Sequence, residues 1–157
     1  MKRRMRKSYF KTDPGAPAPL SIIVERQVRF EEVDPLQIVW HGRYPSYFED
    51  ARLALGNRYG FGYQDFYRAE VPTPIRQLQI DYLGPLRFEE RFTIEARLHW
   101  CEAARINLDY RIRNQKGELV TSGCSVQMML DRDFEVLLNP PPFYQDLLRH
   151  WQAGELS

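Results

Sequence analysis

The chain of 157 residues is long enough for one domain with a sizeable core and too short for two domains of ordinary size. Apolar residues make up 43% and charged residues 27%, which excludes a disordered or fibrous protein. The 22 basic side chains nearly balance the 21 acidic ones, so a net charge of +1 gives no general field for a polyanion, and we expect no nucleic-acid partner.

The first twenty residues stand apart because the basic run MKRRMRK is followed by a proline-bearing stretch. We predict a flexible tail over residues 1–20, or an arm for an acidic partner, and one domain over residues 21–157. No secretory signal and no stretch of roughly 20 apolar residues is recognisable, so we expect a cytoplasmic protein without a membrane span. Cys101 and Cys124 are far apart, which predicts reduced cysteines, no disulfide and no metal site.

Two elements are predicted in the first half of the domain. Residues 21–30 alternate apolar and polar side chains with a period of two, which predicts a half-buried strand ending on the apolar face at Phe30. A stripe at spacing i, i+3, i+4, i+7 and i+11 then predicts a helix of about four turns: Tyr44, Tyr47, Phe48, Ala51 and Leu55. Pro45 fits its first turn and Gly60 its end, and residues 61–74 are predicted to be a connecting loop.

The chain from Leu78 to Leu130 returns to a period of two and predicts four further strands. Their connections are too short for parallel crossovers, so we expect an α+β fold in which an antiparallel five-stranded sheet is wrapped around one long central helix. Tyr82 is assigned to the sheet core and His99 to the surface. The other sheet face is mixed and charged, and the sheet edges need cover, which a dimer continuing the sheet would provide.

The segment VDPLQIVWHGRY, residues 33–44, is the first candidate for chemistry. Asp34 precedes His41 by seven residues, and His41 lies where the predicted helix begins. The first N–H groups of a helix lack internal partners and stabilise an oxygen that becomes negative, so an acid and an oxyanion donor would flank one acyl carbonyl. The alternative is a plain Asp-Pro turn with a capping acid, and the spacing alone leaves both interpretations open.

The segment RFEEVDPLQIVWHGRYPSYFEDAR resembles the active-site signature of hotdog-fold thioesterases of the 4-hydroxybenzoyl-CoA thioesterase type, including relatives associated with the Tol–Pal system. The resemblance is strongest in VDP, IVWHG, Tyr44 and FEDAR. The later stretch QIDYLGPLRFEERFTIEARL also resembles that family, through its Y-x-x-P pattern. This chain departs from the family after the acid, where it has Pro35, Leu36 and Gln37 in place of small residues and glycine, so its turn must form without glycine.

The resemblance implies a hotdog fold and hydrolysis of an acyl thioester, with coenzyme A or an acyl-carrier protein as the thiol part of the substrate and no other cofactor. It implies that Asp34 is the catalytic carboxylate, as nucleophile or general base, and that the amide of His41 polarises the carbonyl. The His41 imidazole either orients the substrate or Asp34, or is a bystander in a residue whose main chain matters. Relatives also suggest a homodimer that assembles into a homotetramer.

Four further residues are candidate substrate-binding positions under this resemblance. Tyr44 and Trp40 would line the pocket beside Gly42, although ordinary core aromatics are an equal alternative for both tyrosine and tryptophan. Glu49 is either a second acid near the acyl group or a solvent-facing partner of Arg52.

Two other functions remain open at this stage. A hotdog dehydratase or hydratase would use Asp34 and His41 as an acid/base pair and release no thiol. A non-catalytic acyl-thioester sensor or scaffold would bind without turnover, with the basic tail docking an acidic carrier protein.

Overall fold

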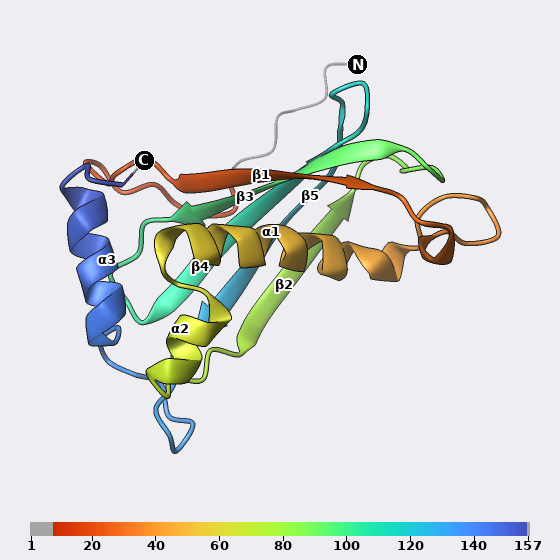
Figure 1. Ribbon diagram of the computed structural model, residues 1–157. Helices are drawn as coiled ribbons and strands as arrows, with labels where there is room; N and C mark the ends of the chain where they lie inside the picture. The colour runs from red at the N-terminus through yellow and green to blue at the C-terminus, as the bar shows by residue number, and fades with distance from the viewer. Residues whose placement is uncertain (1–7, 157) are drawn as a thin grey trace.

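The computed structural model describes residues 8–156, in which helix α1 packs on one face of a five-stranded antiparallel sheet (Figure 1). The strand order is β1-β3-β4-β5-β2, and each neighbouring pair is antiparallel. The expected α+β hotdog architecture is therefore confirmed. The strands are β1 Leu20–Gln27, β2 Ile75–Tyr82, β3 Arg91–His99, β4 Arg105–Arg113 and β5 Leu119–Met128; the helices are α1 Tyr44–Tyr59, α2 Tyr63–Arg68 and α3 Pro142–Gln152, with 3-10 turns η1 Phe30–Glu32 and η2 His41–Arg43.

Helix α1 forms where the apolar stripe predicts it, and all five residues of that stripe are buried. Pro45 lies in the first turn, where its missing N–H removes no internal hydrogen bond. Gly60 caps the end with a φ of 80°, a left-handed conformation that glycine adopts without strain. Because η2 directly precedes α1, one helical run extends from His41 to Tyr59.

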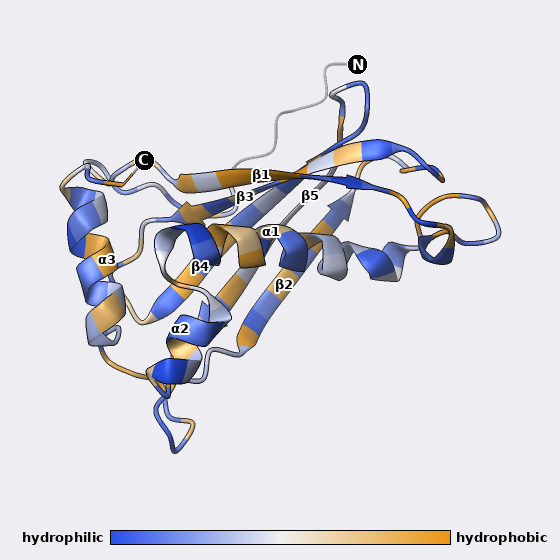
Figure 2. Ribbon diagram, in the orientation of Figure 1, coloured by the Kyte–Doolittle hydropathy of each residue, from blue (hydrophilic) through white to orange (hydrophobic). Residues whose placement is uncertain are grey.

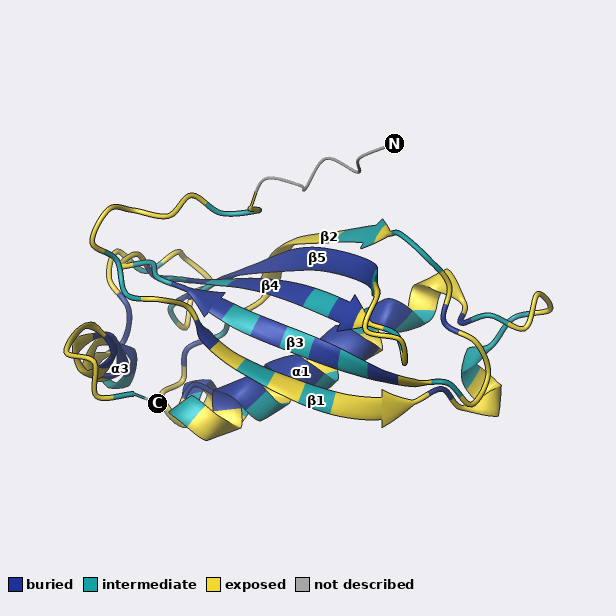
Figure 3. Ribbon diagram, turned by 90° about the horizontal axis from the view of Figure 1, so that it is seen from above, coloured by how far each residue is buried: buried dark blue, intermediate teal, exposed yellow. Residues whose placement is uncertain are grey.

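The core lies between α1 and the inner face of the sheet, with β3, β4 and β5 far more buried than the edge strands (Figure 3). Phe48 of α1 stacks on Tyr110 of β4 with ring centroids 4.3 Å apart and planes 4° apart. Gly123 of β5 permits this approach, since a Cβ there would lie 2.7 Å from Phe48 Cε2 and 2.4 Å from the carbonyl oxygen of Gln79.

The outer face of the sheet carries a charged cluster of Arg97, His99 and Asp109, in which His99 and Asp109 are buried and Arg97 is partly exposed. Arg97 Nε donates to Asp109 Oδ1 at 2.9 Å, and His99 Nε2 lies 3.3 Å from the same oxygen. The ring of Phe10 covers His99 at a centroid distance of 5.1 Å. His99 is buried, so its predicted place on the surface is wrong.

The N-terminal segment, residues 8–19, contacts the rest of the molecule at both of its ends. The Tyr9 hydroxyl donates to Asp81 Oδ2 at 2.6 Å, and the indole N–H of Trp151 donates to the carbonyl of Ala18 at 2.9 Å. The basic run of the predicted tail lies outside the described residues.

The structure differs from the predicted elements at one strand boundary and in two helices. Strand β1 ends at Gln27, and Phe30 begins the turn η1 with its side chain 78% exposed, because Val28 already leaves the sheet to bond with Glu90. The predicted loop 61–74 contains helix α2. Helix α3 was not predicted, although it buries an amphipathic stripe of Tyr144, Leu147, Leu148 and Trp151.

Strand β2 alternates apolar and polar residues along its length (Figure 2), yet its apolar side chains stay partly exposed because it pairs only with β5. Leu78 is 42% exposed and Tyr82 is 50% exposed, so the predicted place of Tyr82 in the sheet core is wrong.

Within residues 8–156, no helix has the length and apolar character needed to cross a membrane.

Candidate active site

The candidate loop folds as a tight hairpin that leads into helix α1. Val33 and Val39 form an antiparallel bridge, and the amide of Asp34 donates to the carbonyl of Ile38 at 2.9 Å. Below this bridge, the amide of Trp40 donates to the carbonyl of Glu32 at 2.9 Å. The apolar residues between Asp34 and His41 therefore form the returning strand of the hairpin.

The tip of the hairpin is a turn closed by Asp34 itself. The Gln37 amide donates to the Asp34 carbonyl at 2.8 Å, and the Leu36 amide donates to Asp34 Oδ1 at 2.8 Å. Gln37 has a φ of 63°, so it takes the left-handed conformation that glycine favours. The turn forms without glycine because Gln37 takes this strained conformation, and the half-buried Asp34 carboxylate is held by the Leu36 amide two residues later.

The start of the helical run presents two amide groups in succession. Neither the His41 N–H nor the Gly42 N–H donates a hydrogen bond to any group within residues 8–156. The peptide oxygens beside them are occupied, since the Trp40 carbonyl accepts from the Arg43 amide at 2.9 Å and the His41 carbonyl accepts from the Tyr82 hydroxyl at 2.6 Å. Unbonded amides at the positive end of a helix form a site suited to an oxyanion.

The hairpin brings Asp34 and His41 into one loop. Their side chains form no hydrogen bond or ion pair with each other. Asp34 lies opposite Ile38, and three residues of extended chain, about 10 Å, lead from there to His41. Convergence of both groups on a single carbonyl stays a prediction.

The aromatic residues of the loop occupy two different environments. Trp40 is 48% exposed and lies against Gly42, where a Cβ would come within 2.3 Å of the indole. Its ring centroid is 5.0 Å from that of His41. Tyr44 is buried and contacts the Tyr82 ring edge-on at 5.1 Å, and burial raises the pKa of Tyr44 to about 12, so its hydroxyl is neutral at physiological pH.

Glu49 is exposed on α1, about 12 Å along the helix axis from His41. Both of its carboxylate oxygens accept from the Tyr63 hydroxyl, at 2.9 and 2.7 Å. Its predicted alternative partner, Arg52, is 1% exposed, and the guanidinium instead donates to Gln127 Oε1 and the Phe61 carbonyl. The predicted ion pair between Glu49 and Arg52 is therefore wrong. The proposed substrate-binding role of Glu49 stays a prediction.

The sequence did not predict that Tyr82 contacts the start of the helical run at His41. Strand periodicity assigned it to the core, because alternation shows which residues share a face and not that the strand lies at a sheet edge. From strand β2 its hydroxyl reaches the His41 carbonyl in η2, 41 residues away in the chain. Its place in the Y-x-x-P pattern was the one available signal.

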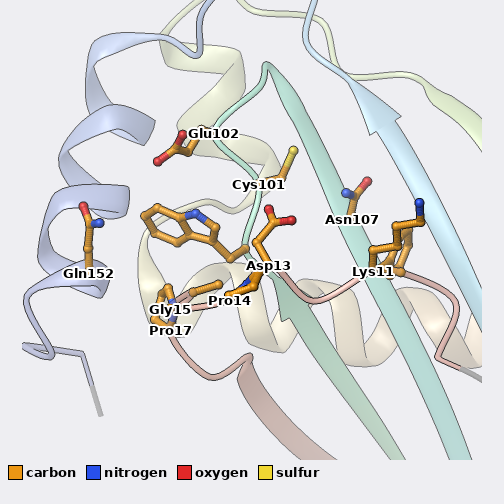
Figure 4. Close-up of a pocket in the computed structure, with 12 residues that line it drawn as sticks. Lys11, Asp13, Pro14, Gly15, Pro17, Cys101, Glu102, Asn107 and Gln152 are labelled. Atoms are coloured by element: carbon orange, nitrogen blue, oxygen red, sulfur yellow. The ribbon is translucent and has the colours of Figure 1, made fainter.

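The candidate site is an open surface on the single chain. Four cavities of about 500 to 720 Å³ were located, and none is lined by Asp34, Trp40 or His41. One of about 540 Å³ lies between the N-terminal segment and residues 100–102, near α3 (Figure 4). Trp40, His41 and Gly42 are all exposed, so these residues do not by themselves enclose a pocket at the start of the helical run.

Comparison with known proteins agrees with the fold and with a thioesterase-like family. The thioesterase-like superfamily matches residues 28–150. YneP of Bacillus subtilis, which carries an acyl-CoA thioesterase name, is 29% identical over 109 residues, covering 69% of this chain and 79% of YneP. The chloroplastic acyl-acyl carrier protein thioesterase ATL3 of Arabidopsis thaliana is 29% identical over 106 residues, covering 66% of this chain and only 56% of ATL3.

A solved structure gives the same result in three dimensions. The DHNA-CoA thioesterase from Staphylococcus aureus superposes with a TM-score of 0.75 at 26% identity, covering 85% of this chain and 91% of that enzyme. The superfamily match over residues 28–150 includes the hairpin, helix α1 and all strands from β2 onward. This chain belongs to the thioesterase-like superfamily.

Proposed function

We propose that this protein hydrolyses an acyl thioester of coenzyme A or of an acyl-carrier protein to the free acid and the thiol. The observation that carries the proposal is the pair of unbonded amides at His41 and Gly42, in the loop that also holds the Asp34 carboxylate. The finer affiliation, to 4-hydroxybenzoyl-CoA and Tol–Pal-associated thioesterases, belongs to this proposal and is supported by the VDP and IVWHG motifs. A cytoplasmic location is also part of it.

The chemistry follows from these groups in one of two ways. As a general base, Asp34 takes a proton from water, the oxygen adds to the carbonyl carbon, and the amides hold the oxyanion until the C–S bond breaks and the thiolate leaves. As a nucleophile, Asp34 attacks the same carbon, expels the thiolate and forms a mixed anhydride that water then hydrolyses. Both routes need an ionised carboxylate.

A second copy of the chain supplies the missing walls in this proposal. Strand β2 is an edge with exposed apolar side chains, and pairing it with β2 of another copy would extend the sheet and cover the candidate site. We propose such a homodimer, assembling further into a homotetramer.

The test of the hydrolytic function is the Asp34→Asn variant. Asparagine keeps an oxygen for the Leu36 amide, so the turn is preserved while the charge is lost. We expect kcat to fall at least ~100-fold with an unchanged melting temperature, measured as thiol release from a panel of acyl-CoAs with a thiol-reactive dye.

The matched control is Asp133→Asn, at an exposed aspartate in the loop after β5, which should leave kcat unchanged. Full activity in Asp34→Asn would contradict the assignment of Asp34. Conversion of an enoyl thioester to its hydrate without thiol release would support a hydratase instead.

A further inference from the structure

Two consecutive peptide groups at the start of the helical run are fixed through their carbonyl oxygens. The oxygen of the Trp40–His41 peptide accepts from the Arg43 amide at 2.9 Å, which is a bond within the turn itself. The oxygen of the His41–Gly42 peptide accepts from the Tyr82 hydroxyl at 2.6 Å, which is a bond from strand β2. The first constraint is local to the turn, and the second adds a long-range bond from one distant side chain.

A planar trans peptide points its N–H and its C=O in opposite directions, so a bond that fixes the oxygen also fixes the amide proton. The Arg43 bond therefore sets the direction of the His41 N–H, and the Tyr82 bond sets that of the Gly42 N–H. A donor on the oxygen also polarises the peptide and strengthens its N–H as a donor. Both amides lack other partners within residues 8–156.

We propose that Tyr82 is a positioning residue for the oxyanion site: through the His41–Gly42 peptide it holds the Gly42 amide as a second donor beside that of His41. This inference rests on the proposed thioester hydrolysis and assigns a role to a residue on a different strand.

The surroundings of Tyr82 suit this role. Its ring is braced edge-on, at 89°, against the buried ring of Tyr44, so the hydroxyl is aimed by packing and not by its own torsion alone. Burial raises the pKa of Tyr82 above its ordinary value, which keeps the hydroxyl protonated, and hence a donor, over the physiological range. The absence of a Cβ at Gly42 leaves room for the Trp40 indole and avoids a clash that would rotate the same peptide.

The Tyr82→Phe variant separates positioning from packing, because phenylalanine keeps the ring on Tyr44 and removes only the hydroxyl. We expect kcat to fall about 10-fold, less than the roughly 100- to 1,000-fold seen when an oxyanion donor is deleted outright, with KM and the melting temperature nearly unchanged. Tyr67→Phe, at a tyrosine 80% exposed on α2, is the matched control and should match the wild type.

A spectroscopic readout tests the same inference without turnover. The probe is a ketone analogue of the substrate in which CH₂ replaces the thioester sulfur and the carbonyl carbon is ¹³C. Its carbonyl resonance should move downfield on binding to the wild type, because two amides polarise it, and the displacement should be smaller in Tyr82→Phe.

The outcomes distinguish this inference from the function on which it rests. Unchanged kcat and an unchanged carbonyl shift in Tyr82→Phe, with an active wild type, would overturn the role of Tyr82 and leave the hydrolysis intact. A parallel loss of kcat, substrate affinity and melting temperature would also overturn it, by showing a purely structural bond. Failure of the wild type to release thiol from every acyl-CoA tested would overturn both.

Discussion

At the scale of single residues, Asp109 illustrates how a buried charge depends on its neighbours. Only 3% of the residue is exposed, between Arg97 and His99 on the neighbouring strand. Burial by itself would raise the pKa of this carboxyl, but the adjacent His99 imidazole and the hydrogen bonds from Arg97 outweigh burial and hold the pKa below its usual range. Folding therefore favours the ionised form of the Asp109 carboxyl.

The lowered pKa of Asp109 predicts a loss of stability in acid. The unfolded carboxyl titrates at about 3.9, so the contribution is complete well above that pH and is lost as the pH falls through it toward the lower folded value. Asp109→Asn should lower the free energy of unfolding by about 2–3 kcal/mol at pH 7, because Arg97 keeps only partial access to water. Urea unfolding between pH 7 and pH 3 should show this difference shrinking with acid.

The control for this prediction is Asp50→Asn, which removes an exposed ion pair with Arg26. Surface pairs contribute little, so its effect should stay within about 0.5 kcal/mol at every pH. A difference for Asp109→Asn that is independent of pH would contradict the ionic origin of its stabilisation.

At the scale of elements, the contact between α1 and the sheet is set by β5. The sheet carries a glycine where Phe48 of the helix descends to stack on Tyr110, and the neighbouring strand β2 approaches the same position. A larger residue at Gly123 would push the helix away or break the pairing of β2 with β5.

Gly123→Ala should therefore destabilise the protein by about 1–3 kcal/mol, the usual effect of overpacking a filled core. Gly84→Ala is the matched control, since its Cβ would meet only Val120, at an ordinary 3.5 Å, and its effect should be within about 0.5 kcal/mol. Equal denaturation midpoints for both variants in urea would mean that helix and sheet are not in close contact at Gly123.

At the scale of the whole molecule, the exposed apolar side chains of β2 lie next to the open candidate site. Ile75, Leu78 and Tyr82 line the free edge, and Tyr82 touches the start of α1. A partner on this edge would cover the strand and also enclose the surface around His41. Assembly and catalysis are therefore expected to fail together.

Light scattering should give a mass of two or four times the 18.7 kDa of one chain. Leu78→Lys should lower that mass to one chain and reduce thiol release, because a charge on the paired edge opposes association. Ile23→Lys on the opposite edge strand, at a residue 64% exposed, should leave both mass and activity unchanged. An active single chain would contradict the dimer as a requirement for the site.

The sequence by itself determined the elements whose signals are local. The apolar stripe from Tyr44 to Leu55 and the glycine at residue 60 fixed α1, because helix periodicity and capping involve residues within a few positions of each other. The alternation after residue 78 fixed the remaining strands, and short connections fixed their antiparallel sense. The motif around Asp34 and His41 located the candidate loop.

Only the tertiary structure decided which of these residues meet. The burial of His99 beside Asp109, and the bond from Tyr82 to the His41 carbonyl, depend on strand order and register, which join positions far apart in the chain. Whether a strand is central or an edge changes the exposure of every apolar residue on it, and alternation is the same in both cases. The sequence therefore identified the candidate loop. The position of β2 next to that loop, which only the tertiary structure shows, placed Tyr82 at the start of the helical run.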